Sequence, residues 1–109
     1  METKSVGDVT VALMEPRLDS ITSGAAEAGL KKLVEEKTRK ILCDFSQTTY
    51  VSSAGLRVLH ITASRLKQAG GQIVVCALNP YVHEVFETAG FTRIFTICDS
   101  EASGLAAFK

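Results

Sequence analysis

The 109-residue sequence lacks a net charge, a long apolar run and a leader-like start. Its twelve basic and twelve acidic residues cancel, whereas nucleic-acid-binding proteins usually carry a basic excess, so we expect no nucleic-acid partner. No stretch approaches the ~20 apolar residues that span a bilayer, and no charged-then-apolar segment opens the chain. We therefore expect a cytoplasmic protein without a membrane span.

Patterns that bind metals or support catalysis are also missing. The three cysteines form no CxxC pair and only two histidines are present, which argues against a zinc site. Cys43, Cys76 and Cys98 stand beside strand-like apolar residues, and we interpret them as buried thiols. Neither a Gly-x-Ser-x-Gly elbow nor a glycine-rich phosphate loop occurs. We expect no enzyme, no metal and no cofactor, with His60 and His83 at the surface.

The apolar fraction of 46% and the length are those of an ordinary globular protein, and we expect residues 1–109 to form a single domain. Apolar periodicity predicts strands at residues 9–14, 40–45, 72–78 and 95–98, and helices at residues 19–37, 53–69, 82–89 and 100–108. The apolar stripe expected on the second helix consists of Leu56, Leu59, Ala63 and Leu66. Strands that alternate with helices indicate an α/β domain with a largely parallel sheet.

Two strands carry more specific signals. Val9, Val11 and Leu13 alternate with smaller residues, which predicts a half-buried strand, and the preceding Gly7-Asp8 pair indicates a hairpin with a short first strand. The continuous apolar run at residues 41–43 is typical of a central strand that is covered on both faces.

The most informative segment, residues 43–56, leads from this central strand into the second helix. Ser52 directly precedes the helical run and is the better helix cap, which leaves Ser53 at the first helical position beside free backbone N–H groups. A phosphate there would be favoured by the positive end of the helix. Plain capping without modification is the alternative. We expect Asp44 to bond the backbone of the turn that follows it.

Taken together, these segments resemble a STAS domain, the family that includes the bacterial anti-sigma factor antagonists. The resemblance rests on the order of elements, on the Val51-to-Leu56 turn into the second helix, and on residues 67–80 and 86–91, and it covers nearly the whole chain. It implies a mixed, mostly parallel five-stranded sheet with about four helices.

The resemblance also implies a function. In partner-switching members of the family, the unmodified domain binds an anti-sigma factor that is also a serine kinase, and so releases a sigma factor. Phosphorylation of the serine at the place of Ser53 ends this binding, and a phosphatase resets the switch. We take Ser53 as the phosphorylation site, with Ser52 as second choice. The expected partner-binding residues are Thr49, Ser52, Ser53, Gly55 and Arg57.

The sequence departs from the family pattern at two positions: Ser52 replaces the usual acidic residue, and Arg57 stands where a glycine often follows the Gly-Leu pair. The first departure favours an alternative, an adaptor subunit of a larger lipid-transport or stress-signalling assembly that is never phosphorylated. A small enzyme or ligand carrier built on Asp44 and the serine turn is a further alternative. Arg57 either pairs with a phosphate or an acidic partner, or is a solvated helix charge.

Overall fold

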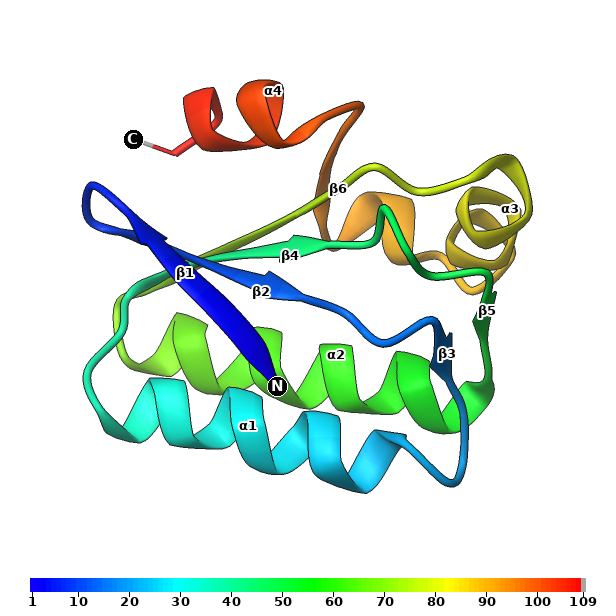
Figure 1. Ribbon diagram of the computed structural model, residues 1–109, viewed down its shortest axis with the longest axis horizontal. Coiled ribbons are helices and arrows are strands. Elements are labelled where there is room, and N and C mark those ends of the chain that lie inside the picture. The colour runs from blue at the N-terminus through cyan, green and yellow to red at the C-terminus, as the bar shows by residue number, and fades with distance from the viewer. Residues whose placement is uncertain (109) are drawn as a thin grey trace.

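A computed structural model describes residues 1–108 of the chain, and its centre is a five-stranded sheet in the order β1-β2-β4-β6-β7 (Figure 1). The strands are β1 (Glu2–Val6), β2 (Val9–Leu13), β4 (Lys40–Asp44), β6 (Gln72–Cys76) and β7 (Thr96–Cys98). The first pair is antiparallel, and the other neighbouring pairs are parallel. The predicted α/β class with a mixed, mostly parallel sheet is confirmed.

Within residues 1–108 the helices are α1 (Ser23–Glu35), α2 (Ser53–Gln68), α3 (Pro80–Thr88) and α4 (Glu101–Ala106), with the 3-10 turn η1 (Phe91–Arg93). α1 and α2 lie side by side on one face of the sheet, α4 lies on the other, and α3 lies at one end (Figure 1). None of these helices has the length and hydropathy to cross a membrane.

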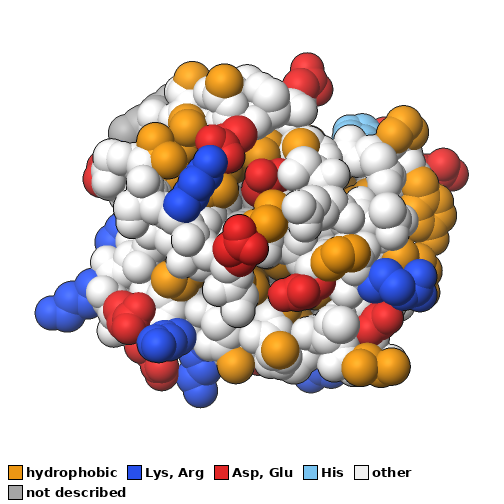
Figure 2. All heavy atoms as spheres, in the orientation of Figure 1, with side chains coloured by type: hydrophobic (Ala, Val, Ile, Leu, Met, Phe, Trp, Pro, Cys, Tyr) orange, Lys and Arg blue, Asp and Glu red, His pale blue; other side chains and the backbone are white. Residues whose placement is uncertain are grey.

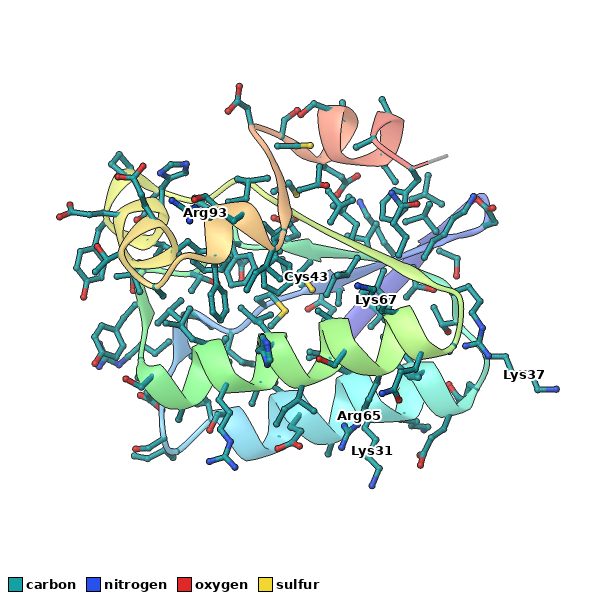
Figure 3. All side chains as sticks on the ribbon, turned by 180° about the vertical axis from the view of Figure 1, so that it is seen from behind. Lys31, Lys37, Cys43, Arg65, Lys67 and Arg93 are labelled. Atoms are coloured by element: carbon teal, nitrogen blue, oxygen red, sulfur yellow. The ribbon has the colours of Figure 1, made fainter. Side chains whose placement is uncertain are left out.

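The central strand is β4, as the sequence predicted. Ile41 and Cys43 are buried against α1 and α2, while Leu42 is buried on the α4 side. The sulfur of Cys43 lies between the sheet and α2 (Figure 3). The prediction for β2 is corrected: Ala12 is fully buried rather than exposed, because α1 and α4 cover both faces of this strand.

Four phenylalanines attach α3 and η1 to the end of the sheet. Phe86 of α3 makes edge-on contacts with Phe45 and Phe91, in both cases with ring centroids 5.7 Å apart. Phe91 also packs on Phe95 at 5.3 Å. Such ring pairs contribute roughly 0.5–1.5 kcal/mol each beyond their buried area. The cluster fixes α3 beside the start of α2.

A second, two-stranded sheet was not predicted. Its strands β3 (Arg17–Leu18) and β5 (Tyr50–Val51) are parallel and too short for a residue period to reveal them. Backbone bonds extend the pairing, from Ser52 N–H to the Leu18 carbonyl (2.9 Å) and from Thr49 N–H to the Pro16 carbonyl (2.8 Å). This small sheet sets where α2 begins.

Several predicted bounds are wrong by a few residues. α1 ends at Glu35, and α4 is shorter than predicted and begins after the cap Ser100. α3 begins at Pro80 because the Asn79 side chain caps it, accepting from Val82 N–H at 2.7 Å. The last strand begins at Thr96. Cys43 and Cys76 are buried as predicted, whereas Cys98 is only half-buried.

Candidate functional site

The candidate site lies at the start of α2, where two adjacent serines have different surroundings. Ser52 is the N-cap, in extended conformation, and its hydroxyl oxygen accepts a bond of 3.4 Å from Gly55 N–H. Ser53 is the first helical residue; it is exposed, and its hydroxyl makes no hydrogen bond to the rest of residues 1–108. The arrangement therefore leaves the Ser53 hydroxyl available for chemistry, while that of Ser52 holds the helix.

Gly55 joins the first turn of α2 to β3. A methyl group added at this position would lie 2.6 Å from the Leu18 carbonyl oxygen and 2.8 Å from the Leu18 Cγ. Only a residue without a side chain permits this approach. Gly55 is buried, so it shapes the site by positioning the helix.

Arg57 lies one helical turn beyond Ser53 and on the same side of α2. Both residues line a hollow of about 430 Å³ between the first turns of α1 and α2, together with Ser23, Glu27, Ala54 and Ile61. Within the described part of the chain Arg57 is exposed and forms no ion pair, whereas Glu27 is 3.9 Å from Arg65. Within residues 1–108, a guanidinium group without an ion pair and a hydroxyl without a hydrogen bond thus line the same hollow.

A second hollow, of about 440 Å³, lies on the other side of the α2 terminus and is mainly apolar. Its lining residues are Leu56, Tyr81, Glu84, Val85, Thr88 and Ala89. Hydrophobic side chains gather at the right-hand edge of Figure 2, the edge where α3 and β5 lie in Figure 1. Half of Tyr81 is exposed there, so this surface offers apolar contact area to another molecule.

Stacked aromatic side chains border this apolar hollow. The rings of Tyr50 and Tyr81 are nearly parallel, with centroids 6.5 Å apart, and the Arg17 guanidinium lies 4.5 Å from the Tyr50 ring centre. Sequence reasoning missed Arg17, Tyr50 and Tyr81 as surface residues of this site. It placed Leu56 in the core, against which Leu56 does pack, but did not predict that Leu56 also lines the hollow. The available signal was a tyrosine just before the serines and another just after a helix-starting proline.

The threonines before β5 organise the loop. Thr48 is buried and donates to the Glu15 carbonyl at 2.8 Å, while the exposed Thr49 donates to the Pro16 carbonyl at 3.2 Å. Asp44 accepts from Ser46 N–H at 2.8 Å, which is the structural role predicted for it. Of Asp44, Thr48 and Thr49, only Thr49 is exposed.

Other titratable groups give no sign of a reactive centre. His60 and His83 are exposed, as predicted, and residues 1–108 contain no cluster of three or more groups suited to a metal ion. Burial raises the pKa of the Cys43 and Cys76 thiols to about 12, which makes both inert as nucleophiles at neutral pH. The start of α2 instead presents an exposed hydroxyl, Ser53, and an exposed guanidinium, Arg57, beside a mainly apolar hollow.

Comparisons with known proteins identify relatives in sequence and in fold. The sequence model of the STAS domain matches residues 1–104. A candidate anti-sigma factor antagonist of Bordetella bronchiseptica, BtrV, is 36% identical over 104 residues, covering 95% of this chain and 90% of the relative. A candidate anti-sigma factor antagonist of Thermotoga maritima has the same fold, with a TM-score of 0.90, 20% identity, and coverage of 96% of this chain and 91% of that one. Phosphorylated SpoIIAA of Bacillus superposes with a TM-score of 0.76 at 15% identity, with 96% of both chains covered.

Proposed function

The chain belongs to the STAS domain family, and from this premise we propose that it is a regulatory binding protein that acts as an anti-sigma factor antagonist. In the unmodified state it binds an anti-sigma factor that is also a serine kinase, and a sigma factor is released. The kinase then phosphorylates Ser53, binding ends, and a phosphatase restores the free hydroxyl. The protein works in the cytoplasm and catalyses no reaction itself.

The observation that carries the proposal is the difference between the two serines. Ser53 offers an exposed, unbonded hydroxyl, whereas the Ser52 oxygen is engaged as the helix cap. A kinase that docks on this surface reaches the Ser53 oxygen without opening the helix. Ser53 is therefore the acceptor we assign, in preference to Ser52.

A phosphate on Ser53 fits the folded domain. It adds about −1.5 to −2 charges at neutral pH, which the amino-terminal end of α2 stabilises by roughly 0.3–1 kcal/mol. Arg57, one turn away and without an ion-pair partner within residues 1–108, is placed to bond the phosphate oxygens. The modified domain thus remains folded, and the phosphate changes the affinity for the partner.

The phosphate on Ser53 weakens partner binding because the serine lies between two hollows that suit docking. An apolar side chain of the partner fills the hollow beside Leu56, Tyr81 and Val85, and an acidic group pairs with Arg57. A phosphate inside that contact is desolvated and competes for Arg57, and penalties of this kind reach several kcal/mol. Since each ~1.4 kcal/mol changes affinity tenfold, a hundredfold loss needs only about 3 kcal/mol.

The test uses the purified chain and each anti-sigma kinase encoded in the same genome, with binding measured by titration calorimetry before and after incubation with ATP. The unmodified chain binds one of them, and ATP lowers the affinity about a hundredfold or more while phosphate appears on Ser53. Ser53→Ala binds without ATP-dependent release, and Ser53→Glu binds weakly. Arg57→Ala removes the guanidinium group, and the unmodified variant therefore binds the kinase more weakly.

Ser52→Ala is the matched control. It loses about 1 kcal/mol of folding stability with its helix cap, yet the complex that it forms is still released by ATP, with phosphate on Ser53. Phosphate found on Ser52 instead would reassign the acceptor. A chain that binds a partner but is never phosphorylated, in vitro or in its native cells, would be a constitutive adaptor subunit.

A further inference from the structure

The strand β1 has a free edge on the outside of the sheet. All five of its residues, Glu2–Val6, are exposed, and among residues 1–108 the strand pairs with β2 alone. In Figure 1 it lies in front of the other strands, with no other element between it and the viewer. Free edges of this kind are templates for pairing with another strand.

The hairpin fixes which backbone groups point out from this edge. Val6 and Val9 flank the two-residue turn Gly7-Asp8, and Gly7 has φ 61°, as the first central residue of a type II′ turn requires. Because the pair that closes such a turn is hydrogen-bonded and pairs alternate along the ladder, Glu2 and Lys4 also bond to β2. The N–H and C=O groups of Thr3 and Ser5 therefore point outward.

Two copies of the strand can pair antiparallel about a twofold axis in only a few registers. In such a pair, residues whose backbone groups point outward must lie opposite each other. A register shifted by one residue would place an outward-pointing residue opposite one that bonds to β2. The twofold axis must therefore pass through Thr3, Lys4 or Ser5. An axis at Lys4 sets Lys4 against the partner's Lys4. An axis at Ser5 leaves Glu2 without an opposite charge and sets Thr3 against the turn glycine of the partner.

The axis at Thr3 is the register that matches charges. It sets Glu2 opposite the partner's Lys4 and, by symmetry, Lys4 opposite the partner's Glu2. Opposite charges across a strand pair are stabilising and like charges are destabilising. We propose that β1 is a self-association surface, through which two copies of this chain join their sheets by antiparallel pairing centred on Thr3.

The surroundings of Lys4 favour the same register. Its ammonium group lies 3.0 Å from Glu101 of α4, over a hollow that also contains Glu2 and Asp44 above an apolar floor of Val11 and Leu13. The hollow holds three carboxylates and one lysine, so it accepts a second cation. In the proposed pairing that cation is the partner's Lys4.

The proposal does not depend on the function of Ser53. β1 lies at the edge of the main sheet, and the start of α2 lies beside β5 (Figure 1). The paired strands are short, so the dimer is weak and its amount depends on protein concentration.

The test is sedimentation equilibrium of the full chain over a range of concentrations. Glu2→Lys and Lys4→Glu each weaken self-association about tenfold or more, because each replaces two attractive pairs by two repulsive ones. An equimolar mixture of these two variants forms a mixed dimer, since attractive pairs return at both positions. The double variant E2K/K4E restores opposite charges across the pair and therefore associates more strongly than either single variant.

A backbone variant tests the strand edge itself. Thr3→Pro removes an outward N–H without touching the β2 ladder, so it abolishes association while the thermal midpoint of unfolding changes little; Thr3→Val keeps the N–H and still associates. Amide exchange of Thr3 and Ser5 slows as concentration rises. A chain that stays monomeric at millimolar concentration, a dimer indifferent to Thr3→Pro, or failure of the mixed variants to pair overturns the proposal.

Discussion

Ser52 and Ser53 are identical in chemistry, but the start of α2 gives their hydroxyls different tasks. The cap oxygen of Ser52 bonds Gly55 N–H, and the backbone of Ser52 also bonds β3 through the Leu18 carbonyl. The Ser53 hydroxyl has no such bond within residues 1–108. A change at Ser52 therefore alters folding stability first, whereas a change at Ser53 alters the surface alone.

Gly55 provides a prediction for a single side chain. Gly55→Ala forces a methyl group against the Leu18 carbonyl, and we expect the free energy of unfolding to fall by about 1–3 kcal/mol. Urea unfolding followed by circular dichroism measures the change. Gly24→Ala in α1 is the control, because nothing lies within 4 Å of its added methyl and alanine is the better helix former, so it gains stability. Equal stability of Gly55→Ala and the original chain would refute the close contact.

The two long helices end with the same hydrogen-bond motif but with different residues in the left-handed position. At the end of α2, Gly70 has φ 78°, and bonds run from Gly71 N–H to the Leu66 carbonyl and from Gly70 N–H to the Lys67 carbonyl. At the end of α1, Lys37 has φ 68° with the matching bonds. A side chain in this conformation costs roughly 1–2 kcal/mol, which makes Lys37 a strained position.

We therefore expect Lys37→Gly to raise the free energy of unfolding by about 1 kcal/mol. The Lys37 side chain is exposed and extends into solvent from the end of α1 (Figure 3), so its removal costs little buried contact. Thermal unfolding by calorimetry measures the gain. Gly70→Ala, with open space around it, is the reciprocal variant and loses a similar amount. A loss of stability in Lys37→Gly would contradict this account.

These same elements show how far the sequence alone leads. Apolar periods predicted four strands of the main sheet and the existence of each α-helix, the Gly7-Asp8 pair indicated the short first strand, and the resemblance to the STAS domain implied the five-stranded sheet. The serine cap was identified from residue type and position. The buried face of α2 was predicted incompletely: Thr62 is also buried, with its hydroxyl donating to the Val58 carbonyl at 2.9 Å, and Leu56 packs against the core as predicted but also lines the hollow beside α3. A hydropathy pattern does not predict such a hydrogen bond. It also does not predict β3 and β5, because these strands of two residues each are formed only by tertiary pairing.

The cysteines report on the stability of the complete domain. Cys43 and Cys76 are fully buried in neighbouring central strands, and burial raises the pKa of each thiol to about 12. Cys98, on the edge strand β7, is half-buried. The thiolate is the reactive form, so native β4 and β6 protect two of the three thiols.

With a thiol-reactive dye under native conditions, we expect one cysteine to react quickly and two to react only through global unfolding. The rate of the slow reaction is proportional to the unfolded fraction. In a variant destabilised by ~1.4 kcal/mol, the two buried thiols therefore react about tenfold faster, and the rate of the fast reaction is unchanged. Peptide mapping assigns the fast site to Cys98. Three fast thiols would show that the sheet opens locally.

The stacked tyrosines give the domain a built-in optical signal. The sequence contains no tryptophan and two tyrosines, and these are the stacked Tyr50 and Tyr81 at the rim of the apolar hollow beside α2. Nearly all of the intrinsic ultraviolet emission of the protein therefore originates at the surface assigned to the partner. The five phenylalanines emit only weakly, so occupancy of that surface can be followed by tyrosine fluorescence on the unlabelled, unaltered chain.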